Sequence, residues 1–431
     1  MCLGLLGRGV GDAEFLAECG ASLIITDLKS KEELSPSLKR LRKYKNIKYT
    51  LGGHKLKNFR NRDMILKAAG VPLDSPYIAE AGKNKIPVEM DASLFSRFTP
   101  ATIIGVTGTR GKSTVTHVLY EMLIKSGRRA FLGGNVKGMA TLPLLKKVKP
   151  GDIIIMELDS WQLQGFGEAK LSPHIAIFTN FLPDHLNYYK GDMNKYFSDK
   201  ANIFLYQKPG DCLVATRGVL NLIRKKGKNL RSKITLAKTI DIPKTWSVAI
   251  LGEHNRTNIA LAKKAAEILG VGKRTIKNVA ESFFGIPGRL EHVSSKLGVD
   301  YYNDTTATTP EAVIAAIKSF EGGRGKVVLI AGGKDKGLKY KALAGEIKRG
   351  VKALILLRDE TTTATEKLSR ALGKVKIPLI FAGGMKEAIV SAKQLALPGE
   401  KIILSPGAAS FGMFRNEFDR GDQFNKIVRK P

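Results

Sequence analysis

Residues 101–125, ATIIGVTGTRGKSTVTHVLYEMLIK, decide the fold of this chain. The apolar run 101–104 predicts a short buried strand, and 105–111 reads as a turn punctuated by three glycines. From Lys112 onward the pattern predicts a helix, because apolar residues recur at helical spacing and form one stripe. The residues of this stripe are Val115, Val118, Leu119, Met122 and Leu123.

This strand, glycine loop and helix together predict a site for phosphate groups. Backbone N–H groups at a helix N-terminus lack partners within the helix, and the positive end of the helix dipole points the same way. Lys112 adds a point charge for terminal phosphates, and the Ser113 hydroxyl is placed for a magnesium ion. We therefore predict a nucleoside triphosphate as the ligand.

The spacing of the glycines differs from that of the common phosphate loop. The pattern here is G-x-x-G-x-x-G-K-S-T, with Gly108 in the middle, so Gly105 stands six residues before Gly111 rather than five. A plain glycine turn is the alternative. Three spaced glycines, Lys-Ser-Thr and an amphipathic helix rarely coincide, which favours the phosphate site.

The length and composition indicate a multidomain globular protein. A chain of 431 residues is too long for one ordinary core, so two to four domains are expected. Cys2, Cys19 and Cys212 lie far apart, which argues against a disulfide framework or a zinc site. Residues 1–6 do not have the pattern of a signal peptide, and no apolar stretch is long enough for a membrane span. We expect a cytoplasmic protein without a membrane partner.

The chain is strongly basic, with 71 Lys and Arg against 39 Asp and Glu and a net charge of +32. Such a charge is compatible with nucleic-acid binding. The lysines are dispersed, however, and the densest clusters, 39–45 and 224–233, have little aromatic interleaving. We expect a lysine-rich solvated surface that attracts small anionic substrates, and no nucleic-acid partner.

The region 1–96 alternates strand and helix signals. An acid, Asp27, follows the glycine turn 7–11 by about twenty residues, which imitates a dinucleotide fingerprint. Taken alone, this supports only a nucleotide or phosphate site at the edge of a Rossmann-like sheet. The other expected elements are strands at 2–6, 22–26, 64–67 and 86–88 and helices at 12–19 and 92–98.

The region 97–288 continues the phosphate-loop domain. The strand predicted at 152–158 carries Glu157, and a carboxylate at the end of a buried strand is the expected magnesium ligand, since unpaired charge there is costly. His185 follows a strand predicted at 175–179. Alone it would be an ordinary loop histidine, but its position just past a strand in the same domain makes it a candidate.

The region from 289 onward predicts a second doubly wound α/β unit. Ligands bind at the carboxyl ends of such strands, where three loops here are rich in glycine or polar residues: 332–336, 383–384 and 405–410. Any one of these loops is also explained as a helix N-terminus that needs a cap. The predicted strands are 327–331, 353–357, 379–382 and 402–404.

Taken together, these motifs resemble the Mur ligases, the ATP-dependent amide-bond ligases of peptidoglycan precursor synthesis. The matching segments cover the chain in family order. They are GVTGTRGKST (105–114), GGN (133–135), MELDSWQL (156–163), NFLPDHLNYY (180–189), DKANIF (199–204), GEHN (252–255), GIPGRLE (285–291), YNDTTATTPEA (302–312), GGKDK (332–336) and SPGAASFGMFRNEFDRG (405–421).

The resemblance implies an α/β fold of three domains. They are a Rossmann-like domain for the UDP moiety (1–96), a central phosphate-loop ATPase domain with a mainly parallel sheet (97–288), and a Rossmann-like amino-acid domain (289–431). Only six residues precede Gly7, so we expect a first strand shorter than that of the family. A monomer is also expected.

The resemblance also implies a reaction. The substrate carboxylate attacks the γ-phosphate of ATP to give an acyl phosphate, and the incoming amine then displaces phosphate. Two anions must meet, which only cations and aligned dipoles make tolerable. The implied cofactors are ATP and Mg²⁺ at two sites, with Mn²⁺ as a substitute.

Site residues are carried over position by position. The implied metal ligands are Ser113, Glu157, His185 and Lys200, the last as a carbamate, although a plain surface lysine is its alternative. Residues implied to act in catalysis are Lys112, Glu157, His185, Lys200 and Arg289. Those implied to bind ATP are Gly108, Thr109, Gly111, Lys112, Ser113, Thr114, Asn255, Arg289 and Asp304. The UDP-linked substrate would meet Gly7, Arg8, Asp27, Asn135 and His185.

Three further positions, Thr308, Lys336 and Ser410, match those that hold D-glutamate in the family. A lysine with two hydroxyls suits a second, side-chain carboxylate. The implied activity is the addition of D-glutamate to UDP-N-acetylmuramoyl-L-alanine, a step of peptidoglycan synthesis and so of cell-wall biogenesis, cell shape and cell division.

Three alternatives remain at this point. One is a Mur ligase that adds a different amino acid, and another is a folylpolyglutamate synthase, against which the Rossmann-like N-terminal domain argues. The third, from another class, is a basic phosphate-loop ATPase that acts on nucleic acid and would show salt-sensitive binding to DNA or RNA.

Overall fold

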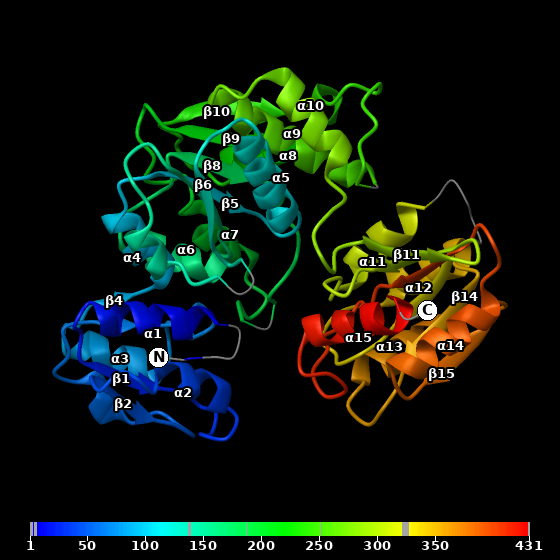
Figure 1. Ribbon diagram of the computed structural model, residues 1–431, viewed down its shortest axis with the longest axis horizontal. Helices are drawn as coiled ribbons and strands as arrows, with labels where there is room; N and C mark the ends of the chain where they lie inside the picture. Colours follow the sequence, from blue (N-terminus) through cyan, green and yellow to red (C-terminus); the bar gives the residue numbers. More distant parts are fainter. Residues whose placement is uncertain are drawn as a thin grey trace. The chain divides into compact units, whose positions relative to one another are not determined.

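The computed structural model describes Leu3 and residues 7–136, 139–186, 188–250, 252–320 and 327–429. The chain divides into two compact units (Figure 1). The first comprises residues 1–185, 189–242 and 258–279, and the second comprises 186–188, 243–257 and 280–431. The first unit contains both the N-terminal elements and the central sheet. The domain boundaries predicted after residues 96 and 288 stay predictions.

The N-terminal elements of the first unit form two short parallel strand pairs, β1 with β2 and β3 with β4. Their parallel pairing confirms the prediction, although the strand expected at 86–88 begins only at residue 88. The predicted strand 2–6 lies outside the described residues except for Leu3. The elements are α1 (Arg8–Glu18), β1 (Leu23–Thr26), α2 (Ser35–Leu41), β2 (Ile47–Thr50), η1 (Leu56–Phe59), β3 (Ile65–Leu66), α3 (Pro76–Lys83), β4 (Val88–Glu89) and α4 (Asp91–Phe98).

The glycine turn predicted at 7–11 is wrong in extent, because helix α1 already begins at Arg8. Gly7 alone serves as the N-cap, with a φ of 89° that favours glycine. Gly11 lies inside the helix for a packing reason: a Cβ there would lie 2.5 Å from the Cβ of Ala140. The glycines therefore mark a close helix approach as well as a turn.

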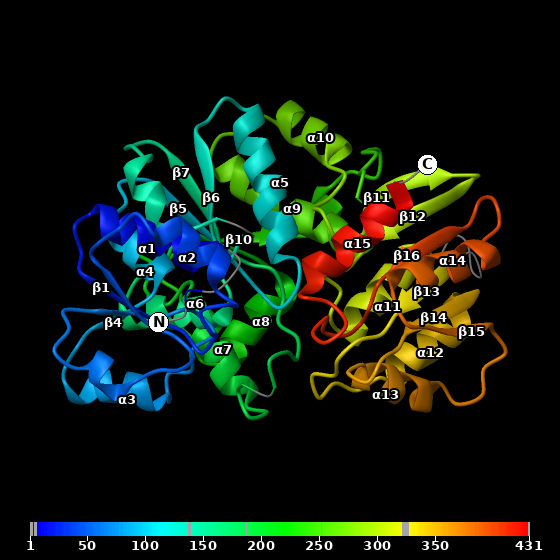
Figure 2. The ribbon, with the colours of Figure 1, turned by 60° about the horizontal axis from the view of Figure 1, so that its bottom comes forward.

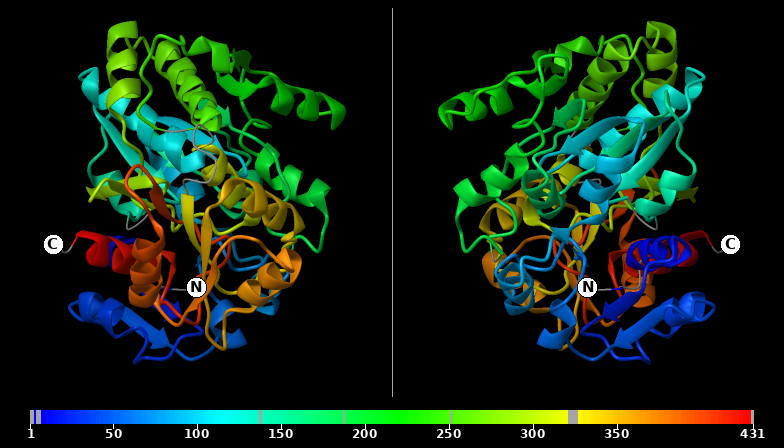
Figure 3. Two further views of the ribbon diagram at one scale, coloured as in Figure 1. Left: turned by 90° about the vertical axis from the view of Figure 1, so that its right-hand side faces the viewer. Right: turned by 90° about the vertical axis from the view of Figure 1, so that its left-hand side faces the viewer.

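The central sheet of the first unit has six strands, all parallel, in the order β10-β9-β8-β5-β7-β6. The apolar runs of the central strands β5, β7 and β8 suit strands that are covered on both faces. Figure 3 shows the cyan strands of this sheet alongside the yellow-green helices α9 and α10. The strands are β5 (Thr102–Thr107), β6 (Ala130–Gly134), β7 (Ile153–Glu157), β8 (Ile175–Phe178), β9 (Cys212–Thr216) and β10 (Lys233–Ala237).

Helices cover this sheet, and α5 packs on β5, β6 and β7. Every residue of the apolar stripe predicted for α5 is buried, which confirms the helix and its inner face. The elements between and after the strands are α5 (Lys112–Lys125), η2 (Leu142–Lys146), α6 (Ser160–Glu168), α7 (Met193–Ala201), α8 (Arg217–Lys225), η3 (Thr239–Asp241), α9 (Glu253–Ile268) and α10 (Lys273–Ser282).

The second unit is built on a sheet of order β11-β12-β16-β13-β14-β15. Only β11 is antiparallel to its neighbour, and this hairpin was not predicted. The strands are β11 (Glu291–Lys296), β12 (Val299–Asn303), β13 (Val327–Ala331), β14 (Ala353–Leu357), β15 (Leu379–Ala382) and β16 (Lys401–Leu404). The last four confirm the predicted strands within one residue, so the predicted α/β class with mainly parallel sheets is confirmed.

Helices lie on both faces of this second sheet (Figure 2). One apolar core lies between the sheet and α11, α12 and α13, and the other lies between the sheet and α14 and α15. These helices are α11 (Pro310–Lys318), α12 (Lys341–Gly350), α13 (Thr363–Leu372), α14 (Met385–Leu395) and α15 (Glu417–Arg429). None of the helices in the described part of the chain combines the length and hydrophobicity that a membrane span requires.

Helix α5 gives a direct test of the central core. Leu119 is fully buried, so Leu119→Ala should lower the free energy of unfolding by about 2–5 kcal/mol through lost burial and the cavity left behind. Ile124 is 39% exposed on the same helix, and Ile124→Ala should cost less than about 1 kcal/mol. Chemical denaturation of both variants measures the difference, and equal losses would contradict the assigned inner face.

Candidate functional site

The glycine loop runs from the end of β5 at Thr107 to the start of α5 at Lys112. Gly108 has a φ of 142°, and a Cβ there would lie 1.9 Å from the Thr179 hydroxyl. Gly111 is the N-cap of α5 with a φ of 82°, and a Cβ there would lie 2.3 Å from Asn258 Oδ1. Both positions require glycine, so the predicted loop is confirmed together with the reason for its residues.

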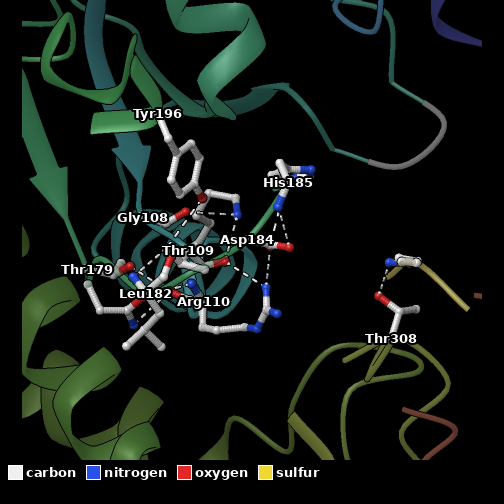
Figure 4. A network of polar contacts seen from close by, with 12 residues as sticks. Gly108, Thr109, Arg110, Thr179, Leu182, Asp184, His185, Tyr196 and Thr308 are labelled. Carbon is white, nitrogen blue, oxygen red and sulfur yellow. Dashed lines mark hydrogen bonds and ion pairs between the residues drawn. The ribbon is translucent and has the colours of Figure 1, made fainter. Parts of the chain in front are cut away.

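The segment after β8 holds this loop in place, as Figure 4 shows. The Thr109 N–H donates to the Asn180 backbone oxygen at 3.0 Å, and the Arg110 N–H donates to Asn180 Oδ1 at 2.9 Å. The Thr179 hydroxyl donates to the Arg110 carbonyl at 2.5 Å. The Thr109 hydroxyl both accepts from the Leu182 N–H at 2.9 Å and donates to the Leu182 carbonyl at 3.1 Å. Hydrogen bonds from within the protein therefore hold the shape of the loop.

Asp184 connects the loop to His185. Its carboxylate accepts from Arg110 Nη1 at 2.9 Å and from the His185 N–H at 3.0 Å (Figure 4). The His185 ring lies 4.6 Å from the Trp161 ring, and burial holds the pKa of His185 below its usual value despite the Asp184 charge. His185 thus lies beside the loop through Asp184, and Arg110 and Asp184 join the predicted residues there, both of them within the matched motifs 105–114 and 180–189.

Lys112 and Ser113 open helix α5. The Lys112 ammonium donates to the carbonyls of Gly108 at 3.1 Å and Thr109 at 3.3 Å, so it folds back over the loop where terminal phosphates would lie. Ser113 is buried in the first turn, and Thr114 is half-buried beside it. This geometry is what the spacing of the motif predicts.

Lys200 is buried on α7, with only 1% of its surface exposed, so the alternative of a plain surface lysine is wrong. Its ammonium donates to the Gly108 carbonyl at 2.9 Å and lies 4.9 Å from the Tyr196 ring centre. Burial, and then the charge of Lys112, lower the pKa of Lys200 well below its usual value. The side chain is therefore an amine inclined to lose its proton beside the phosphate loop.

Glu157 ends β7 and is buried, as predicted. Its carbonyl accepts from the Asn135 N–H at 2.7 Å, which sets Asn135 next to this strand end. No group of three or more His, Cys, Asp or Glu side chains within the described ranges is arranged to hold a metal ion. The predicted set of Ser113, Glu157, His185 and Lys200 differs from such a group because it includes a hydroxyl and an amine.

The residues predicted for the UDP-linked substrate also belong to the first unit. Arg8 Nη1 donates to the Gly134 carbonyl at 3.4 Å, so α1 and the loop carrying Asn135 meet. Asp27 is buried after β1, and its carboxylate accepts from the backbone N–H groups of Leu3 at 2.7 Å and Lys29 at 3.0 Å. Arg8 and Asn135 are thus brought together, whereas the Asp27 carboxylate is occupied by backbone.

The remaining residues predicted for ATP, Asn255, Arg289 and Asp304, belong to the second unit. Asp304 is buried, and its carboxylate accepts from the Ser405 hydroxyl at 2.8 Å and from the Leu290 N–H at 3.1 Å. Burial raises the pKa of Asp304 to about 7, against the opposing charge of Arg289. Arg289 and Asp304 therefore influence each other, and Asn255 lies at the start of α9.

The three positions predicted for the amino acid converge in the second unit. Lys336 Nζ donates to the Thr308 hydroxyl at 2.9 Å. Ser410 follows Ala409, whose backbone exchanges two hydrogen bonds of 2.9 and 3.0 Å with Lys334. The Ser410 side chain is buried, and its hydroxyl has no hydrogen-bond partner among the described residues. An ammonium, a hydroxyl and an unsatisfied buried hydroxyl suit a ligand with carboxylates.

Comparison with known proteins identifies relatives. The model of the Mur ligase middle domain matches residues 106–282, and that of the Mur ligase glutamate ligase domain matches residues 288–408. The UDP-N-acetylmuramoylalanine–D-glutamate ligase of Roseiflexus sp. (strain RS-1) is 37% identical to this chain, and the match covers 99% of this chain and 97% of that protein. The ligase of the same name from Borreliella afzelii (strain PKo) is 34% identical, and the match covers 99% of this chain and 96% of that protein. The fold resembles the UDP-N-acetylmuramate-alanine ligase of Thermotoga maritima, with a TM-score of 0.63, 17% identity and coverage of 99% and 97%.

The position of Lys112 predicts its effect on nucleotide turnover. Lys112→Ala should lower the ATP hydrolysis rate at least about a hundredfold, because it removes the cation placed over the loop. Lys125→Ala, in the last turn of the same helix, is the matched control and should keep normal activity. Phosphate release measures both, and a fully active Lys112→Ala protein would remove this loop from the site.

Proposed function

This chain belongs to the Mur ligase family, and we propose that it joins D-glutamate to UDP-N-acetylmuramoyl-L-alanine while ATP is cleaved to ADP and phosphate. The observation that supports this most is the sequence identity of 37% and 34%, over 99% of this chain, to ligases that carry this activity in their name. The amino-acid loops agree, since Lys336 and Thr308 lie together beside the segment of Ser410. The reaction belongs to peptidoglycan precursor synthesis.

The first chemical step is a phosphoryl transfer. The backbone of Gly108 to Gly111 and the Lys112 ammonium hold the phosphates of ATP, and a carboxylate oxygen of the alanyl group attacks the γ-phosphorus. The bond to the ADP oxygen breaks, and an acyl phosphate forms. Lys112 is suited to stabilise both the phosphates and the attacking carboxylate, because its ammonium lies over the Gly108 and Thr109 carbonyls at the N-terminus of α5.

The second step forms the amide. The amine of D-glutamate attacks the acyl carbon, phosphate leaves, and the nitrogen loses a proton. We assign Lys336 and Thr308 to the side-chain carboxylate of D-glutamate and the Ser410 hydroxyl to its other carboxylate. This assignment gives the buried Ser410 hydroxyl the partner that the described residues do not supply.

We propose that Lys200 is carbamylated and in that form becomes part of a metal site. A buried amine with a lowered pKa reacts readily with carbon dioxide, and the product replaces a disfavoured positive charge with two oxygen donors. Ser113, Glu157, His185 and carbamylated Lys200 would then hold Mg²⁺, with Mn²⁺ as a substitute, at two sites. When bound, the metal neutralises charge on the transferring phosphoryl group.

Several properties follow for the protein in solution. We propose a monomer that acts in the cytoplasm on small-molecule substrates and needs no nucleic acid, with domains at 1–96, 97–288 and 289–431. Size-exclusion chromatography with light scattering tests the monomer. Limited proteolysis tests the boundaries, because cleavage concentrates in exposed linkers between domains.

Phosphate release tests the function. The purified protein is supplied with ATP, Mg²⁺ and UDP-N-acetylmuramoyl-L-alanine, and D-glutamate is compared with L-glutamate, L-alanine and L-lysine. Release that depends on D-glutamate is the expected result. Dependence on another amino acid would keep the family and overturn the specificity. Phosphate release stimulated only by polynucleotide would refute the proposed ligase function.

The carbamate gives a separate prediction. Lys200→Ala should lose activity, and short carboxylic acids such as formate or acetate should restore part of it by supplying the missing oxygen donors. Lys195→Ala, an exposed lysine on the same helix α7, should stay active and show no response to these acids. Full activity of Lys200→Ala without added acid would exclude Lys200 from the site.

A further inference from the structure

Two carboxyl groups outside the reaction chemistry lie near Arg8, one of them buried and the other partly exposed. Asp12 lies four residues after Arg8 on α1, which places both on the same helix face. Asp12 is only 4% exposed, and its Oδ1 accepts from the Leu142 N–H at 3.0 Å. The close approach of Gly11 to Ala140 brings the helix this near to the segment before η2.

The second carboxyl group, Asp91, is the first residue of α4. Its Oδ2 accepts from the Thr141 hydroxyl at 3.3 Å, and that hydroxyl accepts in turn from the Gly134 N–H at 3.1 Å. Thr141 therefore closes the base of the loop that begins after Gly134 and carries Asn135. Asp12 and Asp91 both hold this base, one through Leu142 and the other through Thr141.

The charge of Arg8 completes the cluster. Burial raises the pKa of Asp12 well above its usual value, and the charge of Asp91 raises the Asp12 pKa further. Burial also raises the pKa of Asp91. The positive charge of Arg8 lowers the pKa of both carboxyls, so the guanidinium stabilises their ionised forms. Arg8 Nη1 meanwhile donates to the Gly134 carbonyl at 3.4 Å.

We propose that Asp12 and Asp91 are positioning residues, which hold the Arg8 guanidinium at the base of the Asn135 loop so that it binds the diphosphate of the nucleotide-linked substrate. This inference rests on the proposed function. A free arginine samples many rotamers, and fixing it before the ligand arrives avoids that entropic cost on binding.

The hydrogen bonds to Leu142 and Thr141 do not by themselves require carboxyl groups, because an amide oxygen would accept them as well. Buried carboxylates carry a desolvation cost, and apolar side chains of similar size often stabilise a protein as well or better. The charge of Arg8 acts on both carboxyls, and the Arg8 hydrogen bond reaches the Gly134 carbonyl, next to Asn135. If the two carboxyls fix the Arg8 guanidinium for an anionic ligand, this accounts both for the presence of costly carboxyl groups and for the position of Arg8 next to Asn135.

Binding of UDP-N-acetylmuramoyl-L-alanine, measured by calorimetry, tests the proposal without any turnover. Asp12→Asn and Asp91→Asn keep the hydrogen-bond acceptors and remove the charges. Each should raise the Kd for this substrate about three- to tenfold and leave the Kd for ATP unchanged. Glu18→Gln removes a charge from the exposed end of the same helix, where Glu18 pairs with Lys146, and should bind like the wild type.

A double-mutant cycle shows whether the carboxyls act through Arg8. Arg8→Ala should weaken binding about tenfold, and adding Asp12→Asn or Asp91→Asn should then change the Kd less than twofold. Unchanged binding in the single Asn variants, or full effects in the Arg8→Ala background, would overturn the proposal. A wild type that does not bind this substrate, when ATP still binds, would instead refute the proposed function. Thermal denaturation confirms that each variant is folded.

Discussion

The phosphate loop keeps its shape because a neighbouring segment supplies hydrogen bonds that the loop cannot make within itself. Asn180 pairs with the backbone of Thr109 and Arg110, and Thr179 adds a third bond. The two segments approach so closely that Gly108 has no room for a Cβ atom. This contact also fixes the position at which α5 begins. The first N–H groups of the helix have no partners within the helix, so they can bind an anion held by the loop.

The same contact concentrates positive charge. Arg110 is balanced by Asp184, and Lys112 is held by two backbone carbonyls, whereas Lys200 is buried where its ammonium is disfavoured. Like charges in a buried site lower one another's tendency to ionise. Repulsion between these cations is therefore unfavourable, and a bound triphosphate would relieve it. Electrostatic preorganisation of this kind favours a reaction in which two anions meet.

The sequence predicted those parts of the fold whose signals are local. The strands at 327–331, 353–357 and 379–382 are confirmed residue for residue, because continuous apolar runs between turns are typical of covered parallel strands. The hairpin of β11 was missed because 291–296 has no such run. The burial of Lys200 and the pairing of Arg110 with Asp184, 74 residues apart, arise only from tertiary contacts. No local pattern encodes them.

Strand order explains why distant residues gather. In the central sheet β8, β5, β7 and β6 are successive neighbours, so His185, the glycine loop, Glu157 and Asn135 emerge side by side from their carboxyl ends. In the second sheet β12, β16 and β13 are neighbours, and the loops after them carry Thr308, Ser410 and Lys336. A sequence gives the strands in chain order, whereas a parallel sheet with crossovers reorders them. The motifs could therefore be found one by one from the sequence, but their adjacency depends on the topology.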